Sequence, residues 1–139
     1  MGSSRGVTTA NLIIYVIAML IVIGIIATIT SFFYTNVNNL EDSSSNVSEI
    51  TKFNMYFLQE VKNVNNDIII LNEKSITFLT GNTFTFQDNS IYMNSSRISE
   101  NIKDLKFSLE EINEKKVITV LITIGENLEY TKTTKYVMN

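Results

Sequence analysis

The 139-residue sequence contains no cysteine, no histidine, no proline and no tryptophan. Without cysteine there is no disulfide and no thiolate metal site, and without histidine the commonest general base is missing. Nucleophilic triads that depend on either residue are therefore excluded. The carboxylate pairs Glu41–Asp42 and Glu110–Glu111 adjoin polar, turn-like segments, which is typical of solvated surface. We expect no enzymatic activity, no catalytic or metal-binding residue and no cofactor.

Charge is absent from most of the first part of the chain. Arg5 is the only charged side chain before Glu41, whereas all 14 acidic residues and the other ten of the 11 basic residues lie further along. The remainder is mildly acidic and contains no basic run, which argues against nucleic acid or anionic lipid as its main partner.

The uncharged part consists mainly of one apolar stretch, Leu12 to Phe33, with the sequence LIIYVIAMLIVIGIIATITSFF. As an α-helix it measures about 33 Å, enough to cross a bilayer core of about 30 Å. A core helix of a globular protein rarely runs this long without a polar face. The stretch predicts a single-pass protein of the cytoplasmic membrane. By the positive-inside tendency, Arg5 lies in the cytoplasm and the part beyond Glu41 lies outside it.

A short leader containing Arg5 ends at Gly6 and is followed directly by the apolar helix. This head resembles the N-terminus of type IV pilins and type II secretion pseudopilins. The resemblance implies that a prepilin peptidase cuts between Gly6 and Val7 and that the new amine of Val7 is N-methylated. The alternative is an ordinary signal-anchor in which Gly6 has no special role.

The head departs from the family pattern at two positions. Val7 stands where Phe or Met is usual, and Asn11 stands where the family usually has Glu. The family's Glu is thought to neutralise the terminal amine of a neighbouring subunit in the apolar fibre core, and an asparagine cannot cancel that charge. Asn11 therefore favours a minor subunit, such as those of Gram-positive competence systems, over the major pilin. Small residues at Ala10, Ala18, Gly24 and Ala27 are expected to allow close helix approach within a packing surface from Val7 to Ala27.

Beyond the membrane stretch, the polar segment Glu41–Asn46 is expected to loosen or break the helix, with Ser45 or Asn46 capping a restart. An apolar stripe then recurs at helical spacing, which predicts an amphipathic helix packed on a sheet. The stripe comprises Val47, Ile50, Phe53, Phe57, Val61 and Val64, broadened by Met55, Tyr56 and Leu58.

Alternating apolar residues predict antiparallel strands in the last part of the chain. A meander is expected from Ser75–Thr80, Thr83–Gln87 and Ser90–Asn94, preceded by a strand or loop at Asp67–Leu71. Its inward residues are Ile76, Phe78, Phe84, Phe86, Ile91 and Met93. A short helical turn is expected within Ser95–Ile102, and a charged turn at Glu110–Lys116. Further strands are expected at Leu105–Leu109, Val117–Ile124 and Leu128–Met138, with Val117–Ile124 central because both its faces are apolar.

The predicted fold is α+β and pilin-like, a long N-terminal helix packed on a C-terminal antiparallel sheet. It divides into a leader (1–6), a transmembrane and assembly helix (7–40) and an extracytoplasmic domain (41–139). The resemblance implies a structural minor subunit of a type IV pilus, competence or type II secretion-like envelope fibre. Its expected partners are other pilin or pseudopilin subunits, a prepilin peptidase, the inner-membrane assembly platform and the lipid bilayer. The alternative function is a static, membrane-anchored extracytoplasmic binding domain.

Overall fold

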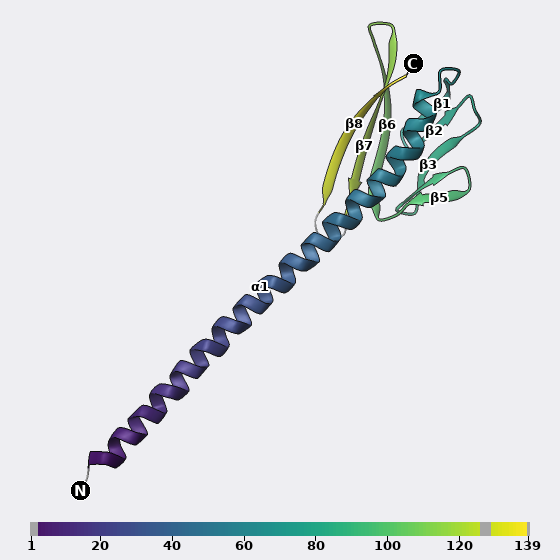
Figure 1. Ribbon diagram of the computed structural model, residues 1–139. Coiled ribbons are helices and arrows are strands. Elements are labelled where there is room, and N and C mark those ends of the chain that lie inside the picture. Colours follow the sequence, from purple (N-terminus) through teal and green to yellow (C-terminus); the bar gives the residue numbers. More distant parts are fainter. Residues whose placement is uncertain (1–2, 126–128, 139) are drawn as a thin grey trace. The chain divides into compact units, whose positions relative to one another are not determined.

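The computed structural model describes residues 3–125 and 129–138, with side chains from Thr8 onwards. The chain divides into two compact units, Met1–Leu40 and Glu41–Asn139. Helix α1 (Ser3–Lys62) provides the described part of the first unit and the beginning of the second, which also contains every described strand (Figure 1). The predicted α+β class, a long N-terminal helix followed by antiparallel sheet, is confirmed.

The predicted interruption at Glu41–Asn46 is wrong, because α1 is continuous through this segment. Each Ser, Asp or Asn in a helix costs only about 0.5 kcal/mol relative to Ala. The segment contains neither glycine nor proline and lies between two strongly helical stretches. The helix therefore extends through it without a second free-energy cost of nucleation. Neither Ser45 nor Asn46 is a cap.

In the second unit, α1 packs through the centre of its predicted stripe. Ile50, Phe53, Phe57 and Val61 are buried, as predicted. The prediction is wrong at both ends of the stripe. Val47 and Val64 are exposed, and α1 ends at Lys62, before Val64. Met55 and Tyr56, which were expected to broaden the stripe, are exposed as well.

The first sheet has five strands in sequence order. They are β1 (Ile68–Asn72), β2 (Ser75–Phe78), β3 (Thr83–Gln87), β4 (Ser90–Met93) and β5 (Ser96–Ser99). The meander is therefore longer than the expected three strands. The helical turn expected within Ser95–Ile102 is a strand, because Asn94, at a φ of 56°, turns the chain back beside β4. Four of the predicted inward residues are buried, and Phe86 and Met93 are half-buried against the core.

The second sheet contains β6 (Ile102–Ile112), β7 (Lys115–Ile124) and β8 (Tyr130–Val137), in that order. β7 is central, as its two apolar faces predict. The charged turn expected at Glu110–Lys116 shrinks to Asn113 and Glu114, whose φ values of 52° and 64° match a tight two-residue hairpin turn. Leu128, the expected first residue of the last strand, lies outside the described residues.

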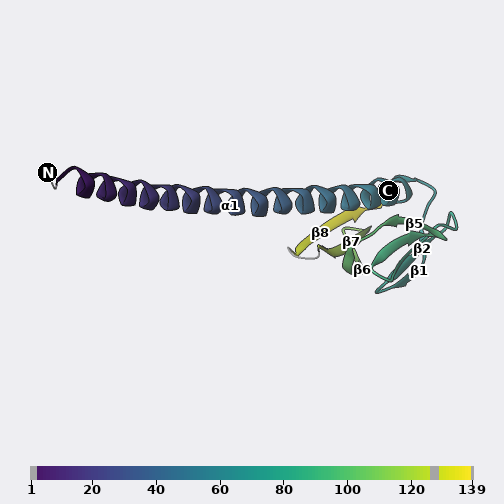
Figure 2. The same cartoon turned by 90° about the horizontal axis from the view of Figure 1, so that it is seen from below.

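Phe57 joins α1 to both sheets. Its ring centroid lies 5.6 Å from that of Phe78 and 5.2 Å from that of Phe84, both in the first sheet. In the second sheet it lies 5.8 Å from Phe107 and 4.9 Å from Tyr136. Both sheets lie on one side of the 41–62 segment of α1 (Figure 2). The core of this unit is therefore one aromatic cluster enclosed by a helix and two sheets.

Candidate assembly surface

The side chains of α1 from Thr8 to Leu40 are all exposed. They include nearly every large apolar residue of the predicted membrane stretch, among them Leu12, Ile17, Leu20, Ile26, Phe32 and Phe33. Leaving one such side chain in water rather than burying it costs about 1.5–3 kcal/mol. Because none of these side chains is covered by the chain itself, this surface requires an apolar environment that another component supplies.

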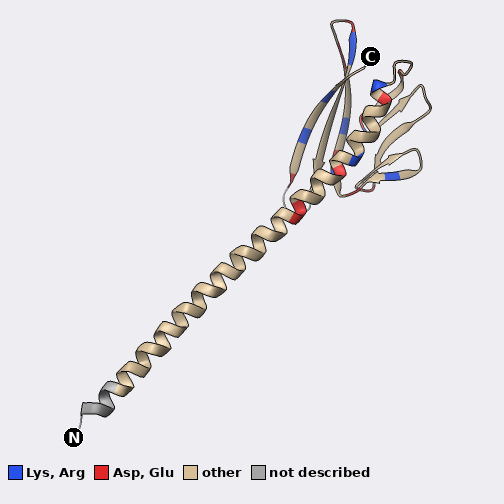
Figure 3. Cartoon of the chain, viewed as in Figure 1, with Lys and Arg blue, Asp and Glu red and all other residues tan. Residues whose placement is uncertain are grey.

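This part of α1 is long and apolar enough to cross a membrane. The helix from Thr8 contains an 18-residue window with a mean hydropathy of 3.1, and none of that window is buried. Between residues 8 and 40 the helix carries no charged side chain (Figure 3). The first unit thus consists of a helix with the length and composition of a single membrane span.

The hydroxyl groups in this segment are compatible with an apolar environment. Thr28 Oγ1 donates to the Gly24 carbonyl oxygen at 2.9 Å, and Thr35 Oγ1 donates to the Ser31 carbonyl oxygen at 3.0 Å. Bonding to the carbonyl four residues earlier satisfies a hydroxyl where no water is present. A Cβ added at Gly24 would meet no atom within 4 Å, so the chain itself does not require glycine there.

The residues predicted from the leader lie at the start of α1. The backbone of Gly6 and Val7 is helical, while Met1 and Gly2 lie outside the described residues. Asn11 is exposed, and its side chain forms no hydrogen bond with the part of the chain that the structure describes. Ala10, Ala18, Gly24 and Ala27 are also exposed, as a surface for close helix approach requires. Cleavage, methylation and the role of Asn11 remain predictions.

Two buried glutamates hold α1 on the first sheet, and sequence reasoning missed both. Glu49 Oε2 accepts a hydrogen bond from the Glu100 backbone N–H at 2.9 Å, and the Glu49 carbonyl oxygen accepts one from Ser99 Oγ at 2.8 Å. Lys52, one turn along, donates to Glu49 Oε1 at 2.5 Å. This turn of the helix is thereby bonded to the last residue of β5 and to the residue that follows it.

Glu60 lies eleven residues further along the same face and is bonded to the other end of the first sheet. Its Oε2 accepts from Asn66 Nδ2 at 2.8 Å and from Thr80 Oγ1 at 2.6 Å. Its Oε1 accepts from Asn82 Nδ2 at 2.6 Å. Asn66 Nδ2 also donates to the Glu60 carbonyl oxygen at 3.0 Å and so caps the C-terminal turn of α1. The sequence signal for both glutamates was their spacing, since Glu49 and Glu60 share a face with Phe53.

A third connection, a single hydrogen bond, joins α1 to the second sheet. The Tyr136 hydroxyl donates to Asn54 Oδ1 at 2.6 Å. Burial raises the pKa of Tyr136 to about 12, because the phenolate loses its hydration there. These three connections carry structural roles. Within residues 3–125 and 129–138 there is no group of three or more acidic, histidine or cysteine side chains placed to hold a metal ion.

The structure is that of an α+β protein whose N-terminal helix is able to span a membrane. The C-terminal part of the same helix packs with two antiparallel sheets to form the second unit. Comparisons with protein families, with curated proteins and with solved structures found no match to this chain.

Proposed function

We propose that this chain is a structural subunit of an envelope fibre of the type IV pilin and type II secretion pseudopilin kind, and a minor subunit within it. The observation that carries the proposal is the exposed, uncharged surface of α1 from Thr8 to Leu40. Such a surface is stable first in the lipid bilayer. It leaves the bilayer only when the apolar helices of like subunits replace the lipid, since exposure to water would cost tens of kcal/mol.

The N-terminal residues would direct the chain into fibre assembly. A prepilin peptidase cuts after Gly6, and the new amine of Val7 is methylated. The inner-membrane platform then brings the helix against those of other subunits. Asn11 replaces the usual glutamate, so this subunit does not neutralise a neighbour's amine. That difference suits a position at or near the fibre tip.

Mass spectrometry of the protein from its native membrane tests the proposal. In the presence of the cognate prepilin peptidase we expect a chain that begins at Val7 and carries one added methyl group. The variant Gly6→Val should keep its leader, because a side chain at residue 6 would obstruct the approach of the peptidase to the scissile bond. An intact leader on the wild-type chain, despite an active peptidase, would contradict fibre assembly and favour a static anchored domain.

A further inference from the structure

The edge strands of the two sheets are not equally protected. Three of them contain a β-bulge in the edge strand itself, at Ile69 of β1, Ile98 of β5 and Lys103 of β6. β8 is the exception among the described edge strands, since it pairs with β7 without a shift from Val117↔Val137 to Ile124↔Tyr130. Bulges twist an edge and hinder the addition of another strand. β8 therefore offers a regular edge of eight residues.

The last hydrogen bond between β7 and β8 shows which backbone groups of β8 point away from β7. The Met138 N–H donates to the Lys116 carbonyl oxygen at 2.9 Å, so this pair belongs to the hydrogen-bonded set of an antiparallel ladder. By alternation, the N–H and C=O groups of Thr131, Thr133, Lys135 and Val137 point away from β7. No described strand pairs with β8 on that side. These four residues are exposed.

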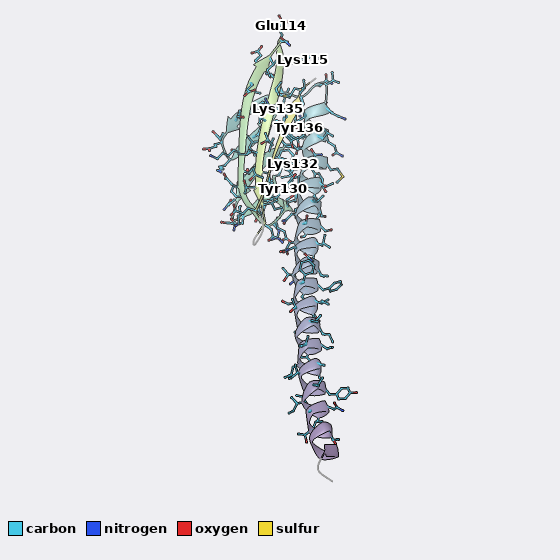
Figure 4. All side chains as sticks on the ribbon, turned by 90° about the vertical axis from the view of Figure 1, so that its left-hand side faces the viewer. Glu114, Lys115, Tyr130, Lys132, Lys135 and Tyr136 are labelled. Atoms are coloured by element: carbon cyan, nitrogen blue, oxygen red, sulfur yellow. The ribbon has the colours of Figure 1, made fainter. Side chains whose placement is uncertain are left out.

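Two lysines define the charge of the edge. Lys132 and Lys135 lie along β8 with Tyr130 (Figure 4) and, being three residues apart, project from opposite faces of the sheet. Lys132 forms no ion pair within the described ranges, and Lys135 lies 3.5 Å from Glu110 with both side chains more than half exposed. A second copy of β8 contains no acidic residue that could lie opposite either lysine. The two lysines thus favour an acidic strand over a second copy of β8.

A cavity of about 310 Å³ lies at the start of the same edge, between α1 and β8. Its lining residues are Ser43, Asn46, Val47, Glu129 and Tyr130. Val47 and Tyr130, which line this space, are 57% and 50% exposed. A strand added to β8 would bring a side chain at its end to this cavity.

We propose that β8 binds an extended, acidic segment of another polypeptide by strand addition, with two carboxylates three residues apart facing Lys132 and Lys135. Main-chain bonds to Thr131, Thr133, Lys135 and Val137 supply affinity, and the two lysines select the sequence. An apolar side chain at the end of the segment occupies the cavity beside Val47 and Tyr130. This inference does not depend on the proposed fibre function.

The test uses the full chain in detergent micelles and an eight-residue peptide, Thr-Val-Asp-Thr-Thr-Glu-Thr-Val, whose final valine lies opposite Tyr130 when its Asp and Glu lie opposite Lys135 and Lys132. Amide NMR should show binding at a peptide concentration of about 1 mM or below, with slowed hydrogen exchange confined to the four outward amides of β8. The double variant K132E/K135E should bind this peptide at least about tenfold more weakly, since two cross-strand charge pairs become repulsive. It should gain affinity for the peptide in which both acidic residues are lysine.

A proline variant tests the main-chain component. Thr133→Pro removes an outward N–H but no bond to β7, so the sheet is retained. It should weaken binding about tenfold, while the matched Thr133→Ala should bind as the wild type does. If Thr133→Pro does not fold, the binding of K132E/K135E to the acidic and the lysine peptides tests the proposal by itself. Absence of binding at about 1 mM, equal binding by K132E/K135E, or protection elsewhere than β8 would each overturn the proposal.

Discussion

Asn82 donates a hydrogen bond from Nδ2 to Glu60 Oε1 at 2.6 Å, and the direction of this bond is fixed by the backbone. The Thr83 N–H donates to Asn94 Oδ1 at 2.9 Å, which leaves Asn94 Nδ2 to donate to Asn82 Oδ1 at 3.0 Å. Asn82 must then present its own Nδ2 to the glutamate. A chain of amides thus ends on a carboxylate that accepts hydrogen bonds from three side-chain donors.

Glu60→Gln tests this role, because the change preserves size while replacing one acceptor oxygen with a donor. At least one of Asn66, Thr80 and Asn82 would lose its acceptor in a buried site, at a cost of about 1–3 kcal/mol in the free energy of unfolding. Chemical denaturation of the full chain in detergent measures the loss. The control is Glu41→Gln, an exposed position on the same helix, which should change stability by less than about 0.5 kcal/mol. Equal stability of both variants would contradict the network.

Phe57→Ala should be the most damaging single truncation in the core. The ring contacts aromatic residues of both sheets and is fully buried, so its removal leaves a cavity that several elements would have to fill. We expect a loss of about 3–5 kcal/mol in the free energy of unfolding, measured by denaturant titration. Met55→Ala, a truncation on the exposed side of the same helical segment, should cost less than about 1 kcal/mol. A loss below about 1 kcal/mol for Phe57→Ala would argue against this core.

The sequence predicted the elements whose signal is periodic and local. Ile50, Phe53, Phe57 and Val61 form a helical stripe, and the alternation of Val117–Ile124 marks a strand with two apolar faces. These patterns define a buried surface without reference to the rest of the chain. They are the parts of the fold that the structure confirms.

The errors concern features that tertiary context decides. Glu41–Asn46 consists of weak helix formers, yet continuity with strong helix on both sides outweighs their summed cost. The burial of Glu49 and Glu60 was not predicted, because a carboxylate is buried only when donors from distant residues converge on it. Glu100 and Asn82, which supply such donors, are 51 and 22 residues away in sequence. No local pattern contains that information.

Acid should weaken the contact between β6 and the turn after β1. Lys74 bonds to Asp104 and lowers the pKa of that carboxyl below its ordinary value of 3.8. The unfolded chain regains the ordinary pKa, so this stabilisation is present above about pH 4 and is lost as the pH falls through the lower folded-state value. NMR titration of the Asp104 carboxyl should show the lowered pKa.

The variant Lys74→Met should return the Asp104 pKa toward its ordinary value and make stability less steeply dependent on pH below about 5. Lys115→Met serves as the control, since Lys115 is exposed and forms no ion pair with a described residue. An Asp104 pKa that does not respond to Lys74→Met would show that the pair does not form in solution.

Ser44→Pro should distinguish a continuous helix from an interrupted one. Proline at this position would remove the hydrogen bond from the residue 44 N–H to the Leu40 carbonyl and would clash with that carbonyl, at a cost of about 3 kcal/mol or more. We expect reduced helicity by circular dichroism and faster hydrogen exchange of the amides around Asp42–Asn46. Ser44→Ala, at the same exposed position, should slow exchange slightly because alanine is the stronger helix former. If the segment were a loop, the proline variant would exchange and unfold as the wild type does, and two independently capped helices would replace α1.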